Sequence, residues 1–381
     1  MLKGTFPLDL LQERRTPFYF YDSSLLRRTL EEVKRCIADR PSWQVHYAVK
    51  ANANPALLAL IAESGLGADC VSGGEVQAAL DAGFEPSSVV YAGVGKRDDE
   101  IRLALGAGIG RLNVESTAEL LVINEIAGSM GVTADFSFRV NPDIGAHTHA
   151  NITTGLAENK FGIHHSQLVQ AIELADSLEN VRLRGIHFHI GSQILDMSDF
   201  VSLCNRVNGI VADLEGRGVA LTDINVGGGL GIEYEHPNHL PVAAFGPYFD
   251  VFKRQLGKQY PVHFELGRSI VAPCGTLISR VLYVKDGLYK QFAVLDASMT
   301  ELIRPALYHA YHRIENLSSD GPECKYDVVG PVCESSDVFG KGVVLNECRR
   351  GDLIAIRSAG AYGESMASRY NLRELPESLV V

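Results

Sequence analysis

The sequence predicts an α/β fold in which a (β/α)8 barrel of the TIM type is joined to a β-sandwich or β-barrel domain. Three observations carry this prediction. Short apolar runs alternate with segments of helical periodicity, and polar or glycine-rich groups follow nearly every run. After about residue 275, strand-like runs follow one another with little helix between them. A chain of 381 residues has room for one barrel and a second domain.

Eight candidate strands make up the predicted barrel. They are residues 45–49, 67–71, 89–92, 111–114, 136–140, 184–190, 223–226 and 262–266. Apolar residues at i, i+3 and i+4 indicate helices between them, most clearly at 55–64, 74–82 and 98–107. Glycine or proline marks most of the junctions.

An open doubly wound sheet would give the same alternation, so the polar residues decide between the two folds. An open sheet concentrates its functional groups at one switch point, whereas a barrel gathers the C-terminal ends of all its strands around one mouth. The groups that follow the runs are Lys50, Ser72, Gly93, Glu115, Asn141, His189, Gly227–Gly229 and Gly267–Arg268. Their spread over the strands favours the barrel.

A second domain is predicted from the change of pattern near residue 275. Strand-like runs follow at 277–284, 292–296, 326–329 and 352–357, and one helical stretch interrupts them at 299–311. The run PFYFY at residues 17–21 precedes the barrel and is expected to join this domain. We therefore expect a barrel domain at 24–275 and a β domain formed by 1–23 and 276–381.

Composition excludes several classes of function. Lysine and arginine number 35 against 46 acidic residues, a net charge of −11, and no basic run argues for nucleic-acid binding. No apolar run is long enough to span a membrane, and the N-terminus lacks a signal-peptide pattern. The seven cysteines are scattered without a CxxC pair, so we expect no disulfide framework, no metal site and a cytoplasmic protein.

Residues at the predicted barrel mouth suggest a phosphate-bearing cofactor. Lys50 ends the first strand, where burial would lower its pKa and suit it to Schiff-base chemistry, although a solvated surface lysine fits the same position. The run NVGGGLG contains Gly228 and Gly229, and FELGRS contains Gly267 and Arg268. The loops after the seventh and eighth strands commonly bind phosphate in this fold, whereas a glycine run alone is also typical of a flexible loop.

Two further side chains complete a pattern typical of pyridoxal phosphate sites. Glu265 in the last strand could keep a pyridinium nitrogen protonated, or could be an ordinary barrel ion-pair partner. His187 and His189 face the same side of their strand, and one of them could stack on a flat ring or simply pack in the core. The combination of lysine, acid, histidine and glycine loops predicts a pyridoxal 5′-phosphate site.

Candidate substrate residues lie in the second domain. Arg304 and Tyr308 are four residues apart in LIRPALY and could share a helix face, and arginine is a natural bidentate partner of a carboxylate. Cys333 and Glu334 are adjacent in GPVCESSD, where the thiol could donate a proton or be inert packing. Tyr362 lies in a glycine-rich turn and means little alone.

At these motifs the chain resembles the alanine-racemase-like, fold type III pyridoxal-phosphate decarboxylases, and within them the branch that acts on meso-diaminopimelate. The matching motifs extend from residue 47 to about 368. They are YAVKAN, GADCVSGGE, NVESxxEL, RVNP with AHTHxxIxTG and KFG, HFHIGSQI, GGGLGI, ELGRSIV, IRPALY, GPVCESSD and GAYGxSMAS.

The resemblance implies roles for individual residues. Lys50 would hold the cofactor covalently, His189 would stack on its ring, and both would be catalytic together with Cys333, the proton donor. The remaining cofactor-binding residues would be Ser192, Gly228, Gly229, Glu265, Gly267, Arg268 and Tyr362. The substrate-binding residues would be Arg268, Arg304, Tyr308, Glu334 and Tyr362. The resemblance also implies a homodimer with shared active sites, in which the partner subunit supplies Cys333.

The implied activity is decarboxylation of meso-2,6-diaminopimelate to L-lysine and CO2, the last step of lysine biosynthesis. An ornithine- or arginine-type decarboxylase of the same fold is the alternative, but its substrate has no distal carboxylate for Arg304. A non-catalytic relative would lack Lys50 or Cys333, or the β domain. Two positions depart from the family pattern: Leu266 replaces a proline, and Ser298 replaces a glycine.

Overall fold

The computed structural model describes residues 2–3, 6–142, 160–257 and 260–381, and it divides into two compact units. The barrel unit consists of Thr29–Gly231 and Ala243–Ile270. The β unit consists of Met1–Arg28, Ile232–Val242 and Val271–Val381. The segment Ile232–Val242 therefore groups with the β unit, although it lies between two barrel strands in the sequence.

Eight parallel strands form the closed barrel that the sequence predicts. In ring order they are β4, β5, β6, β7, β8, β10, β11 and β12, and pairing between β8 and β10 closes the ring. The short β9 (Ile163–His164) extends β8. The bounds are β4 Gln44–Ala48, β5 Gly67–Cys70, β6 Val89–Tyr91, β7 Arg111–Val114, β8 Ala134–Asn141, β10 Val181–His187, β11 Asp223–Asn225 and β12 Val262–Leu266.

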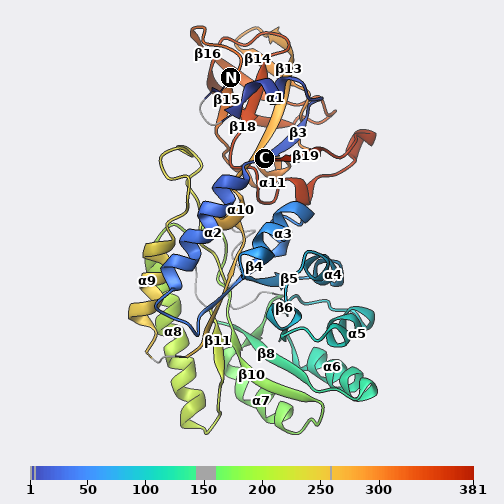
Figure 1. The fold of residues 1–381 in the computed structure, drawn as a ribbon, viewed down its shortest axis with the longest axis vertical. Helices are drawn as coiled ribbons and strands as arrows, with labels where there is room; N and C mark the ends of the chain where they lie inside the picture. Colours follow the sequence, from blue (N-terminus) through green and yellow to red (C-terminus); the bar gives the residue numbers. More distant parts are fainter. Residues whose placement is uncertain (1, 4–5, 143–159, 258–259) are drawn as a thin grey trace. The chain divides into compact units, whose positions relative to one another are not determined.

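Helices lie on the outside of the barrel strands, as Figure 1 shows for α4, α5 and α6. Polar caps start several of them at the ends of strands; Ser72, for example, accepts a hydrogen bond from the backbone of Glu75 at the start of α4. The bounds are α2 Ser23–Ile37, α3 Pro55–Glu63, α4 Gly73–Asp81, α5 Asp98–Ala107, α6 Thr117–Met130, α7 Leu168–Asp176, α8 Met197–Gly216, α9 Phe245–Gln255 and α10 Arg268–Val271.

An aromatic cluster fixes the position of β12. The ring of Phe264 lies 5.0 Å from that of Phe249 and 5.2 Å from that of Phe252, both on α9, and all three are buried. Because side chains alternate along a strand, Phe264 packs outward on the helix while Glu265 points into the barrel. Truncation of a phenylalanine in such a core costs about 3–5 kcal/mol, so this packing holds Glu265 firmly in place.

The β unit is built on a sheet in the order β15-β18-β13-β14-β16-β17. The strand β3 (Phe18–Tyr21) pairs antiparallel with β13 and parallel with β19 (Glu377–Val380), which confirms that the N-terminal strand joins the β domain. The other bounds are β13 Gly275–Asp286, β14 Gln291–Leu295, β15 Ile314–Asn316, β16 Glu323–Val329, β17 Val338–Asn346 and β18 Leu353–Ile356, with short elements at β1 Leu2–Lys3, β2 Phe6–Pro7 and α1 Leu8–Gln12.

The predicted helix at 299–311 is wrong in extent. Only α11 (Arg304–Tyr308) forms, with Pro305 in its first turn and His309 in the left-handed conformation at its end. Proline lacks the N–H that a continuing helix needs, so it begins a helix and does not lie in the middle of one. Residues 299–301 instead form a turn around the buried carboxylate of Glu301.

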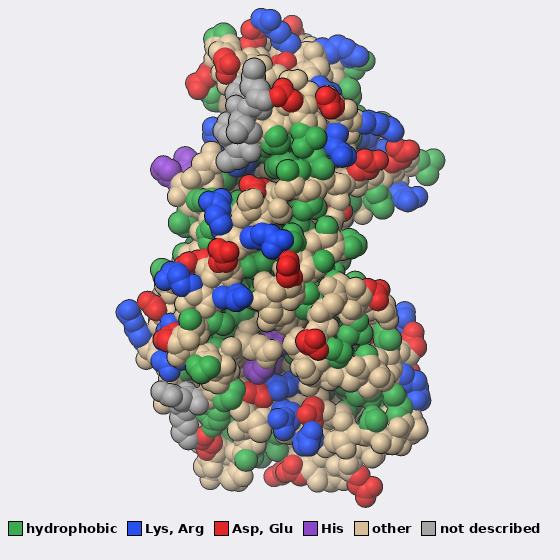
Figure 2. All heavy atoms as spheres, viewed as in Figure 1, with side chains coloured by type: hydrophobic (Ala, Val, Ile, Leu, Met, Phe, Trp, Pro, Cys, Tyr) green, Lys and Arg blue, Asp and Glu red, His purple; other side chains and the backbone are tan. Residues whose placement is uncertain are grey.

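Other surface and chemical features of the described residues are unremarkable. Basic and acidic side chains are interspersed over the face drawn in Figure 2. Within the described ranges, no helix combines the length and hydropathy needed to cross a membrane. The same residues hold no group of three or more histidine, cysteine, aspartate or glutamate side chains arranged around a metal ion.

Candidate active site

Lys50 follows β4 directly, in a single 3-10 turn (Val49–Ala51). Its Nζ lies 3.6 Å from Oδ2 of Asp69, and its side chain is 38% exposed whereas that of Asp69 is 1% exposed. Lys50 is therefore only partly desolvated, and its charge faces a carboxylate at the end of the neighbouring strand β5.

Asp69 was not among the predicted site residues. Burial, followed by the negative charge of Glu265, raises its pKa to about 8, although the charge of Lys50 acts in the opposite direction. Neither carboxylate oxygen of Asp69 accepts a hydrogen bond within the described part of the chain. The sequence did contain a signal for Asp69, because it is an acidic residue inside the run GADC, where a buried strand is predicted. Buried acids are rare unless they are paired.

Glu265 is held by side chains from three other barrel strands. Its Oε1 accepts hydrogen bonds from Asn113 at 3.2 Å and Asn225 at 2.7 Å, and its Oε2 lies 2.9 Å from Nε2 of His187. Burial alone would raise the pKa of Glu265, but His187 and the charge of Lys50 together lower it well below its ordinary value. The carboxylate therefore stays ionised inside the barrel.

His187 and His189 lie in different surroundings although both belong to the motif IHFHIGSQ. His187 is the partner of Glu265. Burial lowers the pKa of His189 well below its usual value, and the charges of Lys50 and Arg139 lower it further, so its ring is neutral. The backbone N–H of Gly228 donates to Nδ1 of His189 at 3.4 Å.

Two glycine-rich loops, one with Gly228 and Gly229 and the other with Gly267 and Arg268, lie near His189. A Cβ on Gly228 would lie 1.9 Å from the carbonyl oxygen of Glu265, and Gly229 has a φ of +108°, so neither position accepts a larger residue. Nε and Nη2 of Arg268 both lie 3.2 Å from Oγ of Ser192. A Cβ on Gly267 would lie 3.0 Å from the Cβ atoms of Ala48 and Ala51, which flank Lys50. The predicted phosphate residues are thus brought together beside Lys50.

A buried ionic network supports the mouth at β6, β7 and β8. Nη1 of Arg139 lies 2.9 Å from Oε1 of Glu115, whose other oxygen accepts from the backbone of Gly162 at 2.8 Å. The side chain of Lys96 is 1% exposed, and its Nζ lies 2.6 Å from Oε1 of Glu119. Arg139 lies close enough to His189 to lower its pKa, so this network contributes to the electrostatics of the site.

The predicted motif at 146–155 is outside the described residues.

In the β unit, the candidate substrate residue Arg304 is 5% exposed and held by two neighbours. Its Nη1 donates to Oη of Tyr234 at 3.0 Å and to Nε2 of His312 at 2.9 Å, and its guanidinium lies over the Tyr234 ring, 5.2 Å from the centroid. Nδ1 of His312 lies 2.8 Å from the carbonyl oxygen of Arg357. Because a carbonyl only accepts, Nδ1 carries the proton and Nε2 accepts from Arg304.

The other predicted β-unit residues are more exposed. Tyr308 lies on α11 with Arg304 and is half-buried, as is Tyr362, which has a φ of +56°. Cys333 and Glu334 are exposed in the loop between β16 and β17. The backbone N–H of Cys333 donates to Asn371, and Glu334 accepts from the hydroxyl of Tyr370.

Comparison with known proteins identifies the family. Residues 24–272 match the family model described as the pyridoxal binding domain of pyridoxal-dependent decarboxylases. A relative from Bacteroides thetaiotaomicron, named diaminopimelate decarboxylase, is 59% identical over 379 residues, which cover 99% of this chain and 98% of the relative. The chain belongs to the diaminopimelate decarboxylase family of pyridoxal-dependent decarboxylases.

Solved structures of this family share the whole fold. Diaminopimelate decarboxylase from Helicobacter pylori, complexed with L-lysine, is 42% identical with a TM-score of 0.93 and covers 98% of this chain and 93% of its own. The enzyme from M. jannaschii, also in complex with L-lysine, is 34% identical with a TM-score of 0.92, covering 100% and 90%. Lysine/ornithine decarboxylase from Vibrio vulnificus, at 22% identity and a TM-score of 0.83, shows the fold alone.

The barrel-unit residues fit the cofactor of this decarboxylase family. An ionised carboxylate held by three strands, a neutral imidazole and a lysine lie close together, and the close approach at Gly228 leaves room for backbone only. Pyridoxal phosphate needs an amine to bind it, an acid for its ring nitrogen and a glycine-rich loop for its phosphate. Each of these requirements has a matching group in the barrel.

Proposed function

We propose that this protein decarboxylates meso-2,6-diaminopimelate to L-lysine and CO2 as a pyridoxal 5′-phosphate enzyme of the cytoplasm. The observation that carries the proposal is the 59% identity to a diaminopimelate decarboxylase over nearly the full length of both chains. The structures of relatives in complex with L-lysine, the product of this reaction, support the same substrate.

The bound cofactor supplies an electron sink that takes up the electron pair left by the departing CO2. Lys50 would hold it covalently through its Nζ amine. Glu265 keeps the pyridine nitrogen protonated, and its own ionised state is maintained by His187, Asn113 and Asn225. His189, whose ring is neutral because burial lowers its pKa, would lie against the ring of the cofactor.

The two glycine-rich loops would hold the phosphate of the cofactor. Ser192 and Arg268, which lie within 3.2 Å of each other, contribute a hydroxyl and a guanidinium. Gly228, Gly229 and Gly267 in these loops complete the site. A Cβ at any of these glycines would lie within about 3 Å of other protein atoms, so the loops pack closely only because these positions carry no side chain.

Substrate recognition depends on Arg304. Its buried guanidinium, oriented by Tyr234 and His312, pairs with the distal carboxylate of diaminopimelate. Tyr308, Glu334, Tyr362 and Arg268 bind the remaining polar groups, with Tyr362 also beside the cofactor. Ornithine and arginine lack a distal carboxylate and would not form the charge-assisted hydrogen bond to Arg304, which is worth roughly 1–3 kcal/mol.

Cys333 donates the proton that replaces CO2 on the substrate carbon. The chain acts as a homodimer in which each subunit supplies its Cys333 segment to the site of its partner. The exposed position of Cys333 within its own chain supports this arrangement, because a proton donor is not expected to face solvent in the assembled enzyme.

The test is a substrate panel. Purified protein with added pyridoxal phosphate is incubated separately with meso-diaminopimelate, ornithine, arginine and lysine, and the products are identified by chromatography and mass. We expect L-lysine from diaminopimelate and little amine from the other three. Faster release of putrescine, agmatine or cadaverine would assign the chain to the alternative class, and no product from any substrate would indicate a non-catalytic relative.

A further inference from the structure

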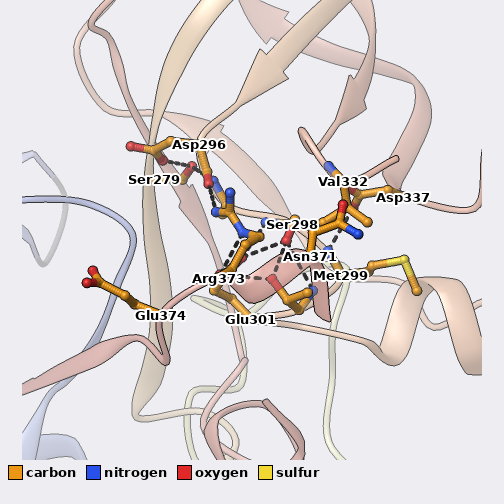
Figure 3. Close-up of polar contacts among 12 residues, drawn as sticks. Ser279, Asp296, Ser298, Met299, Glu301, Val332, Asp337, Asn371, Arg373 and Glu374 are labelled. Atoms are coloured by element: carbon orange, nitrogen blue, oxygen red, sulfur yellow. Dashed lines mark hydrogen bonds and ion pairs between the residues drawn. The ribbon is translucent and has the colours of Figure 1, made fainter. Parts of the chain in front are cut away.

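The loop that carries Cys333 and Glu334 is anchored at its base by Asp337. Asp337 is 3% exposed; its Oδ1 accepts from the backbone of Met299 at 2.7 Å and its Oδ2 from that of Val332 at 2.8 Å. Figure 3 shows Asp337 between these two partners. The base of the loop is therefore held by a buried carboxylate, but its tip is exposed.

The tip of the loop contacts the C-terminal segment of the chain. The backbone N–H of Cys333 donates to Oδ1 of Asn371 at 3.1 Å. The hydroxyl of Tyr370 donates to Oε1 of Glu334 at 2.7 Å. Two consecutive residues of the C-terminal segment thus hold two consecutive residues of the loop.

The C-terminal segment is itself anchored close by. Nη2 of Arg373 donates to the carbonyl oxygen of Asp296 at 2.5 Å, and its Nε lies 3.4 Å from Oε1 of Glu301. Figure 3 shows Arg373 reaching toward both residues. Glu301 also accepts from the backbone and hydroxyl of Ser298, at 2.6 and 2.9 Å, so the serine that replaces the family glycine adds one hydrogen bond to this anchor.

The backbone at Asn371 explains why this residue type fits there. Asn371 has a φ of +54°, in the left-handed region that asparagine tolerates better than most residues with a side chain. From this backbone conformation, the short side-chain amide of Asn371 reaches the N–H of Cys333. Glycine also adopts this conformation readily. Glycine at this position removes the acceptor without adding strain.

We propose that Asn371 and Tyr370 are positioning residues for the active site: Asn371 sets the place of the Cys333 thiol, and Tyr370 sets that of the Glu334 carboxylate. The proposal rests on the proposed function, in which Cys333 is the proton donor. A donor must lie within hydrogen-bonding reach of the atom that it protonates, and a displacement of about 1 Å can cost on the order of 100-fold in rate. Within its own chain, the tip has little other packing to prevent such a displacement.

The decisive variants are Asn371→Gly and Leu372→Gly. Leu372 also has a positive φ, at +57°, and its side chain is 96% exposed, so its replacement controls for a glycine in the same segment. On the cofactor-loaded enzyme we expect Asn371→Gly to lower kcat for diaminopimelate by roughly 10-fold or more with little change in KM. Leu372→Gly should stay within about 2-fold of wild type, and Asn371→Asp, which keeps the acceptor, should recover part of the loss.

Tyr370→Phe tests the contact between Tyr370 and Glu334 separately from the contact between Asn371 and Cys333. It removes only the hydroxyl that holds Glu334, so we expect it mainly to raise KM, because Glu334 binds substrate in the proposed function. Equal effects of Asn371→Gly and Leu372→Gly would overturn the proposal. So would a loss in Asn371→Gly that appears only in KM, or a loss in Tyr370→Phe that appears only in kcat.

A readout independent of activity is the alkylation rate of Cys333 by iodoacetamide, measured by peptide mapping on the folded variants. We expect faster alkylation of Cys333 in Asn371→Gly and an unchanged rate in Leu372→Gly. An unchanged rate in both would overturn the positioning role. If Cys333→Ala keeps full activity, the proton-donor role falls, but the alkylation comparison still decides whether Asn371 positions this residue.

Discussion

His312 and Arg304 share a hydrogen bond of 2.9 Å in the interior of the β unit, where they are 2% and 5% exposed. His312 is in turn held by the carbonyl of Arg357, and Tyr234 holds the same guanidinium nitrogen from another direction. Tyr234 and His312 thus orient the buried guanidinium, and an oriented guanidinium suits the recognition of a carboxylate.

Replacement of His312 by leucine should therefore weaken substrate binding. It leaves an N–H of the buried Arg304 without its acceptor, and we expect KM for diaminopimelate to rise roughly 10-fold, since an unmade buried hydrogen bond costs about 1–3 kcal/mol. His312→Gln, which can accept, should lose less. His309→Asn is the matched control, because His309 is exposed and has a φ of +53° that asparagine tolerates. Steady-state kinetics on the three variants would contradict this account if the control behaved like His312→Leu.

Glu265→Gln should damage catalysis much more than folding. An amide cannot keep the pyridine nitrogen protonated, so we expect kcat to fall by on the order of 100-fold or more. The variant keeps the shape of the side chain, and its amide oxygen can still accept from Asn113 and Asn225, although its amide nitrogen cannot accept from His187. Kinetics with saturating cofactor, together with the thermal unfolding midpoint, separate the two effects. A kcat within 2-fold of wild type would rule out the assigned role.

Asp69 should make the stability of the cofactor-free protein depend on pH. Its pKa in the folded protein is raised to about 8 from an ordinary value of 3.8, chiefly by burial. A group whose pKa is raised on folding contributes stability that is complete below the unfolded pKa and is lost as pH rises through the folded pKa. The free energy of unfolding should therefore fall between about pH 4 and pH 8 by up to a few kcal/mol.

The measurement compares wild type with Asp69→Asn by denaturant unfolding at pH 5 and pH 8, without cofactor. The variant cannot ionise, so it should gain stability relative to wild type as the pH rises. Parallel changes in the two proteins would show that Asp69 does not titrate in this range.

A shared active site predicts complementation between two inactive variants. Lys50→Ala and Cys333→Ala subunits, mixed in equal amounts and allowed to exchange, form mixed dimers in which one site has both residues intact. Random pairing should restore about a quarter of the wild-type activity. Exchange demonstrated by mass, with no recovered activity, would argue against a donor supplied by the partner.

The barrel strands could be predicted because each has a local signal. The bounds of the strands at 111–114 and 262–266 are those of the structure, since in both runs polar and apolar residues alternate and a polar residue or a glycine follows directly. The helix at 299–311 was overpredicted because its apolar spacing outweighed Pro305. The strand Val338–Asn346 was missed because much of it is exposed and it contains two glycines.

The supporting residues of the site had no such local signal. Tyr234 and Arg304 are 70 positions apart, and Asn371 and Cys333 are 38 apart, so only the fold brings each pair together. Asp69 and Arg139 are charged residues within buried strands, which periodicity treats as ordinary interior-facing positions. The motif residues were found from resemblance, whereas their partners required three-dimensional contacts.

The central claim is best tested by the stoichiometry of the reaction with meso-diaminopimelate. Holoenzyme is incubated with a limited amount of substrate, CO2 is trapped and counted, and lysine is quantified with its configuration assigned. The account predicts one CO2 and one L-lysine for each diaminopimelate consumed, and neither product from Lys50→Ala. Substrate loss without CO2, or CO2 accompanied by a product other than L-lysine, would contradict it.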